Sequence, residues 1–139
     1  MFKTILVPVD LADPEHFKDA VRTATDMARQ SGAKMRLMTV VPPVQPSVAH
    51  YLPPDTHERI LGDAKTKLDL LAQESGLEVN VSTVVREGSV YHEVLDEAKS
   101  AGADLIVMGS HRPAMSTYLL GSNAARIVRH APCSVMVLR

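Results

Sequence analysis

Short, unbroken apolar runs alternate with longer amphipathic stretches along the whole of this chain. The runs cover residues 5–9, 35–41, 77–85, 105–108 and 134–138. Between them, apolar residues recur at helical spacing, in stripes that cover residues 20–28, 60–72, 90–98 and 124–128. Continuous Val, Ile and Leu runs are typical of strands covered on both faces, and helical stripes are typical of the helices that cover them. The pattern therefore predicts five parallel strands joined by four right-handed helical crossovers.

The residues between these segments agree with that prediction. Gly32, Gly76 and Gly102 each follow a helical stripe, where a left-handed residue commonly ends a helix. Residues 42–54 hold five prolines and show no periodicity. They predict a surface loop that leads into a helix beginning near residue 55 or 56.

The order of the elements predicts where a ligand would bind. We expect an α/β fold: a single five-stranded parallel doubly wound sheet, in the strand order 3-2-1-4-5, with helices on both faces. In that order the connections reverse direction between strands 1 and 4, so the loops leaving these strands diverge and open a crevice. The residues after Val9 and after Met108 are therefore the expected source of any chemistry.

Length and composition limit the classes of protein that this chain can form. Its 139 residues fit one domain, residues 1–139, and 45% hydrophobic with 22% charged residues is typical of neither a disordered nor a membrane protein. The formal net charge of -1 argues against a protein that binds nucleic acid by neutralising phosphates. The one cysteine, Cys133, cannot form an intramolecular disulfide. We expect a cytoplasmic protein that binds neither nucleic acid nor membranes.

The segment after the fourth run combines glycine with small polar residues. Gly109 would let the backbone approach a ligand closely, and residues 121–123 open the next helix. Unpaired N–H groups and the positive end of the helix dipole favour an anion there, and His111 and Arg112 could add donors to a phosphate. The same residues also fit an ordinary strand exit, a solvated loop and a helix capped by Ser122. Their spacing does not choose between the two interpretations.

The turn after the first run carries carboxylates instead of glycine. A phosphate would be repelled by Asp10 and Asp13, which distinguishes this turn from the first turn of a dinucleotide-binding fold. Asp10 is better suited to ribose hydroxyls or to a hydrated divalent cation such as Mg²⁺, with a role in the turn itself as the alternative. Asp13 precedes Pro14, a pair typical of a helix N-terminus, so we interpret Asp13 as a helix cap.

The remaining residues offer little chemistry. The six histidines do not pair at the spacing of a zinc site, and no cysteine pair accompanies them, so we predict no structural metal. A general base or nucleophile is not evident beyond Asp10 and His111. We therefore name no catalytic residue.

Three segments of the sequence, residues 5–10, 103–110 and 120–137, resemble the universal stress protein (UspA-like) family. The resemblance spans the whole chain in the expected order, and the turn at residues 110–113 is similar to that of the enterobacterial F/G-type members. It implies an adenine-nucleotide-binding α/β fold, commonly a dimer joined through the last strand. ATP-binding members carry a second glycine where this chain has Arg112, and a third glycine one residue later than Gly121.

Carried over by motif, the resemblance implies a nucleotide site made of three groups of residues. The adenosine side would be lined by Pro8, Val9 and Asp10, with Val40 beside the adenine. The ribose and phosphates would be wrapped by Gly109, Ser110, His111 and Arg112, and the phosphates held by Gly121, Ser122, Asn123 and Ala124. The implied ligand is ATP, with AMP and ADP as alternatives, accompanied in one version of the site by a divalent cation such as Mg²⁺.

We therefore expect an adenine-nucleotide-binding stress-response protein, regulatory or sensing, with at most slow ATP hydrolysis. The alternative is a nucleotide-free dimeric interaction module, because the glycine pattern departs from that of the ATP-binding members. A flavin carrier lacks support, since the chain has no tryptophan and no phosphate-binding first turn. A phospho-acceptor receiver would need an acidic cluster that residues 85–88 do not supply. The apolar last run predicts a homodimer through an uncovered strand edge, with a higher oligomer left open.

Overall fold

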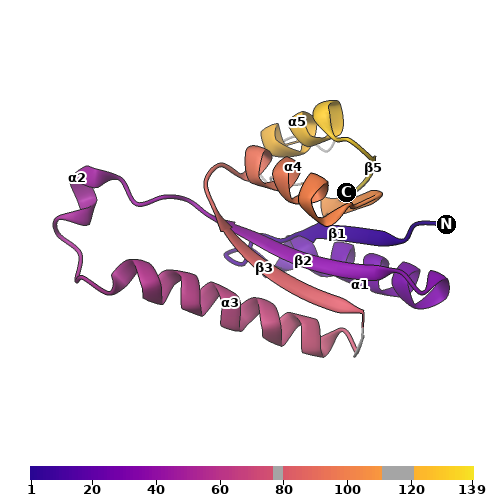
Figure 1. The fold of residues 1–139 in the computed structure, drawn as a ribbon, viewed down its shortest axis with the longest axis horizontal. Coiled ribbons are helices and arrows are strands. Elements are labelled where there is room, and N and C mark those ends of the chain that lie inside the picture. Colours follow the sequence, from indigo (N-terminus) through magenta and orange to yellow (C-terminus); the bar gives the residue numbers. More distant parts are fainter. Residues whose placement is uncertain (77–79, 111–120) are drawn as a thin grey trace.

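Five parallel strands form one sheet in the order β3-β2-β1-β4-β5 (Figure 1). The computed structural model describes residues 1–76, 80–110 and 121–139. The strands are β1 (Thr4–Pro8), β2 (Lys34–Val41), β3 (Val81–Glu87), β4 (Leu105–Gly109) and β5 (Ser134–Leu138). The predicted fold class and strand order are confirmed.

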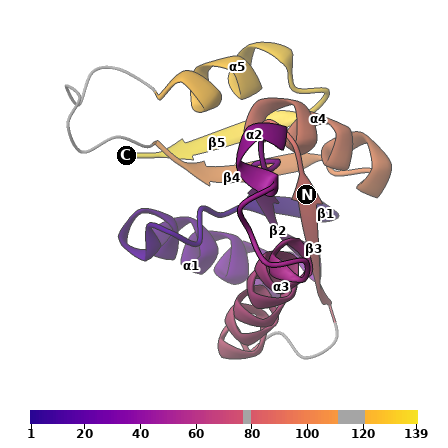
Figure 2. The ribbon, with the colours of Figure 1, turned by 90° about the vertical axis from the view of Figure 1, so that its left-hand side faces the viewer.

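Helices cover both faces of this sheet (Figures 1 and 2). The covering helices are α1 (Pro14–Ser31), α3 (Thr56–Glu74), α4 (Val90–Ala101) and α5 (Ser122–His130), and a short helix α2 (Pro46–Ala49) lies apart from them. Helices α1 and α3 pack against one face, and α4 and α5 against the other. Within the described ranges, no helix has the length and apolar composition to cross a bilayer.

The central strand β1 supplies side chains to two separate hydrophobic cores. Ile5 and Val7 pack in the core beneath α1 and α3, whereas Leu6 packs in the core beneath α4 and α5. All three are fully buried, because successive side chains of a strand point to opposite faces of the sheet. This double coverage explains why the strand reads as an unbroken apolar run instead of an alternating one.

Helix boundaries follow the local signals in the sequence. Gly32 is the C-cap of α1 and Gly102 is the C-cap of α4, and both glycines have positive φ angles, 70° and 66°. Helix α3 begins at Thr56, as predicted, and α5 ends at His130 shortly before Pro132.

Two segments differ from the sequence prediction. The third strand covers Val81–Glu87 instead of residues 77–85, and residues 77–79 lie outside the described part of the chain. The predicted loop at residues 42–54 contains α2, which is a single turn standing away from the sheet (Figure 1). This turn forms because Pro46 needs no hydrogen bond at the first helical position, while the N–H groups of Val48 and Ala49 both donate to the Gln45 carbonyl.

Candidate functional site

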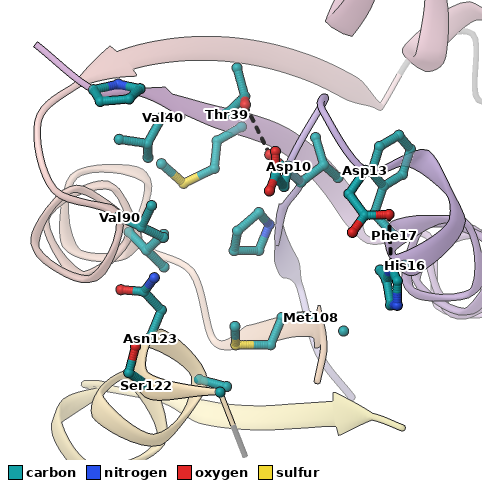
Figure 3. A pocket seen from close by; sticks show the side chains of 18 residues that line it. Asp10, Asp13, His16, Phe17, Thr39, Val40, Val90, Met108, Ser122 and Asn123 are labelled. Carbon is teal, nitrogen blue, oxygen red and sulfur yellow. Dashed lines mark hydrogen bonds and ion pairs between the residues drawn. The ribbon is translucent and has the colours of Figure 1, made fainter. Parts of the chain in front are cut away.

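A crevice of about 430 Å³ opens where the carboxyl ends of β1 and β4 separate (Figure 3). Its walls come from the β1–α1 turn, the end of β2, the start of α4 and the start of α5. This is the point where the strand order reverses, and the sequence predicts that a ligand would bind here. The predicted site residues that line it are Pro8, Val9, Asp10, Val40, Gly109, Gly121, Ser122, Asn123 and Ala124.

Among the described residues, one predicted site residue, Ser110, is not among those lining the crevice. The backbone N–H of Ser110 donates to the Leu138 carbonyl at 2.6 Å, which ties Ser110 to the end of β5. His111 and Arg112 lie outside the described residues. The predicted phosphate contacts of this segment therefore stay predictions.

The crevice has further lining residues that the sequence did not place in the site. They are Asp13, His16, Phe17, Met38, Thr39, Pro42, Val90, Val94 and Met108. Most belong to the apolar runs and stripes that define the strands and helices, and nothing in those patterns marks the end that faces a cavity. The one available signal was position, since Met38 and Thr39 directly precede Val40 at the carboxyl end of a strand.

The β1–α1 turn is held by a closed set of hydrogen bonds. The Val9 N–H donates to the Met38 carbonyl at 2.8 Å, and the Thr39 hydroxyl donates to the Val9 carbonyl at 2.9 Å. One carboxylate oxygen of Asp10 accepts the Ala12 N–H at 3.0 Å, and the Asp10 carbonyl accepts the Asp13 N–H at 3.0 Å. Asp10 is thus a turn residue that also presents an exposed carboxylate to the crevice.

Asp13 occupies the N-cap position of α1 but caps no N–H with its side chain. Its carboxylate lies 2.7 Å from Nδ1 of His16, and Pro14 takes the first turn of the helix as predicted. Both partners of this pair line the crevice, and each is about two-thirds buried. The position predicted for Asp13 is therefore confirmed, while the expected capping bond is replaced by the contact with His16.

Gly109 is required by the packing of α1 against β4. A Cβ atom at this position would lie 2.5 Å from the backbone carbonyl oxygen of His16, a distance that real Cβ atoms essentially never show. The structure shows a close approach of Gly109 to the helix, and its expected approach to a ligand stays a prediction. This constraint operates whether or not a ligand is bound.

The first turn of α5 forms the wall opposite Asp10 and Asp13 (Figure 3). Gly121, not Ser122, occupies the N-cap, and the first helical bond runs from the Ala125 N–H to the Gly121 carbonyl at 2.9 Å. The N–H groups of residues 122–124 consequently have no partner within the helix. Ser122 and Asn123 are exposed, so this turn can donate hydrogen bonds to an anion in the crevice.

The ionisable side chains of the two walls are distributed unevenly. Asp10, Asp13 and His16 lie on the α1 side, and the lining residues that the structure describes include no lysine or arginine. Attraction for an anion in this part of the site therefore comes from backbone N–H groups and the dipole of α5. The carboxylates face the opposite end of whatever occupies the crevice.

Comparisons with known proteins agree on one family. A model of the universal stress protein family matches residues 1–139. The chain is 36% identical to Universal stress protein G of Escherichia coli O157:H7, covering 100% of both sequences. Its fold is similar to UspA from Lactobacillus plantarum, with a TM-score of 0.80, 28% identity and coverage of 99% of this chain and 97% of the other. It also resembles an Archaeoglobus fulgidus universal stress protein in complex with dAMP, with a TM-score of 0.64, 19% identity and coverage of 99% and 98%.

Proposed function

Because the chain belongs to the universal stress protein family, we propose that its crevice binds an adenine nucleotide as part of a regulatory or sensing role in stress. The ligand is ATP, with AMP and ADP as alternatives. A protein of the same fold in complex with dAMP supports the class of ligand. The support from this chain itself is a match between the crevice walls and the two ends of a nucleotide.

The observation that carries the proposal is the backbone edge of Val40, which makes no backbone hydrogen bond toward β1 among the described residues. In a parallel ladder, the N–H and C=O of alternate residues point to opposite neighbouring strands. Met38 accepts the Val9 N–H, so Met38 faces β1, and Val40 two residues later faces the same side. There β1 has ended at Pro8 and the crevice begins. An N–H beside a C=O matches the ring-nitrogen acceptor and amino donor that adenine presents side by side.

The remaining walls suit the rest of the nucleotide. The first turn of α5 offers N–H donors to the phosphates, and the exposed Asp10 carboxylate can accept hydrogen bonds from ribose hydroxyls. In a version of the site that includes a divalent cation such as Mg²⁺, Asp10 would hold the ion, which would offset negative charge of the phosphates. Hydrolysis is slow at most in this proposal, since none of the site residues is assigned a catalytic role.

Calorimetric titration of the purified protein tests the proposal. We expect saturable heat with ATP, ADP or AMP, and much weaker binding of GTP, whose base presents a carbonyl where adenine has its amino group. Mass spectrometry of ligand released from the protein provides an independent check. No heat with any adenine nucleotide, together with no released nucleotide, would favour the dimeric interaction module instead.

We further propose that the protein forms a homodimer through β5. Strand β5 pairs with β4 on one side, and no other strand among the described residues pairs with its second edge. Its residues Val135–Leu138 are only partly buried. An apolar strand with an open edge can pair with a second copy of itself. Light scattering at micromolar concentration should give twice the mass of one chain, and the mass of a monomer would refute the dimer.

A further inference from the structure

We propose that Thr39 is a positioning residue that keeps the backbone of Val40 open to the base of the nucleotide. This inference rests on the proposed function and deepens it, because it identifies what makes the crevice selective for adenine. It concerns a side chain that the resemblance to the family did not single out. Thr39 itself need not touch the ligand.

The hydrogen-bond ladder between β1 and β2 stops one bond short of closing the crevice. Pro8 pairs with Met38, and the Val9 N–H donates to the Met38 carbonyl at 2.8 Å. The next bond of a regular parallel ladder would run from the Val40 N–H to the Val9 carbonyl. Among the backbone hydrogen bonds of the described residues that bond is missing, and the Val9 carbonyl accepts the Thr39 hydroxyl instead.

Burial of Thr39 keeps its hydroxyl, and not the Val40 N–H, as the donor to the Val9 carbonyl. Thr39 is 5% exposed and Val9 is 6% exposed, so water competes little for either group. A buried hydroxyl that loses its acceptor costs free energy, and a β-branched side chain has few rotamers with which to leave it. Figure 3 shows this bond at the edge of the crevice beside Asp10, where β1 and β2 begin to separate.

Removing the hydroxyl should close the ladder. The Val9 carbonyl would then be a buried acceptor without a donor, and the Val40 N–H is the donor that the ladder supplies. Pairing the two would draw the end of β2 toward β1. It would also occupy the N–H that we assign to the ring nitrogen of adenine.

The test uses three substitutions at Thr39 and one elsewhere. Thr39→Val keeps the shape and removes the hydroxyl, Thr39→Ala removes it without adding bulk, and Thr39→Ser retains it. The control is Thr25→Val, because Thr25 is also 5% exposed but its hydroxyl donates to the Met35 sulfur, away from the crevice. Circular dichroism establishes that each variant is folded before binding is measured.

The first readout needs no nucleotide. Amide hydrogen exchange at Val40, followed by NMR, should be fast in the wild type, Thr39→Ser and Thr25→Val. It should be slowed at least about tenfold in Thr39→Val and Thr39→Ala, because a ladder bond protects the amide. A role of Thr39 in stability alone would not slow exchange at this amide.

The second readout is base selectivity. Affinity for ATP should fall at least about tenfold in Thr39→Val and be restored to within about threefold of the wild type in Thr39→Ser. Inosine triphosphate carries a ring N–H where adenine has an acceptor, so the wild type should discriminate against it and Thr39→Val should not. Wild-type binding with an unchanged Val40 amide and unchanged selectivity in Thr39→Val would overturn the role of Thr39 alone. Absence of any adenine-nucleotide binding by the wild type would overturn the proposed function.

Discussion

The two walls of the crevice are built in opposite ways. The wall formed by β1, β2, β4 and α1 is largely buried backbone, in which Val9, Thr39 and Gly109 are fixed by hydrogen bonds or close packing. The wall formed by α5 is an exposed first turn whose N–H groups have no helical partner. Substitutions in the first wall should therefore change folding stability, while substitutions in the second should change ligand affinity without harming the fold.

Gly109→Ala is expected to have the largest effect on stability. The new Cβ would meet the His16 carbonyl at 2.5 Å, so α1 must move away from β4. We expect the free energy of unfolding to fall by roughly 1–3 kcal/mol, measured by urea denaturation. Gly62→Ala is the matched control, because a Cβ there meets nothing within 4 Å and alanine is favoured within helix α3. It should stabilise the protein by about 0.5–1 kcal/mol.

Ser122→Glu tests the exposed wall, where we expect ligand affinity to change and folding stability to be kept. A carboxylate at the first position of α5 interacts favourably with the helix dipole, so stability should stay constant or rise slightly. The same charge would repel a phosphate, and we expect ATP affinity to fall at least about tenfold, which is ~1.4 kcal/mol. Ser122→Gln, similar in size but neutral, should bind ATP far better than Ser122→Glu. Equal ATP affinities in the two variants would contradict the proposed contact between the phosphates and α5.

Asp10→Asn addresses a residue of the buried wall that also exposes its carboxylate to the crevice. Asparagine can still accept the Ala12 N–H through its side-chain oxygen, so the turn should persist and the thermal midpoint should change little. Loss of the negative charge weakens a hydrogen bond from a ribose hydroxyl, and we expect a two- to fivefold loss of affinity, roughly. A loss of stability comparable with that of Gly109→Ala would show that the charge itself holds the turn.

At the end of the sheet opposite the crevice, a change of pH should alter the folding stability without altering ligand binding. Burial alone would raise the pKa of Asp104, but hydrogen bonds from the backbone N–H groups of Thr4 and Lys3 outweigh it and lower the pKa below its usual value. The stabilisation from this carboxylate is therefore fully present above the ordinary aspartate pKa of about 3.9 and is lost as the pH falls through the lowered value.

Asp104→Asn should consequently give a small decrease in stability near pH 7 that disappears under strongly acidic conditions. Urea denaturation of both proteins between pH 2 and pH 7, roughly, measures the difference. ATP affinity at pH 7 should be the same in both. A stability difference that stays constant down to the lowest pH would contradict the role of the carboxylate.

How far the sequence predicted the molecule depended on whether each signal was local. Buried strands such as Thr4–Pro8 can be predicted because coverage on both faces gives an unbroken apolar run. The strand order then predicts where the crevice opens. The requirement for Gly109 could not be predicted, since the atom that it accommodates belongs to His16 on a distant helix. Thr39 was missed for a related reason, because its hydroxyl matters only once β1 lies beside β2. Helix α2 was missed because a single turn has no periodicity.

The α2 segment has a practical consequence, because it leaves and rejoins the body at two secured points. The Gly88 N–H donates to the Val41 carbonyl at 3.1 Å where the chain leaves β2, and His57 pairs with Glu87 at 3.0 Å where it enters α3. Between these anchors Tyr51 is 88% exposed and contributes little to either core. A fluorescent reporter inserted there would leave the scaffold intact, in a segment whose first residue, Pro42, lines the crevice.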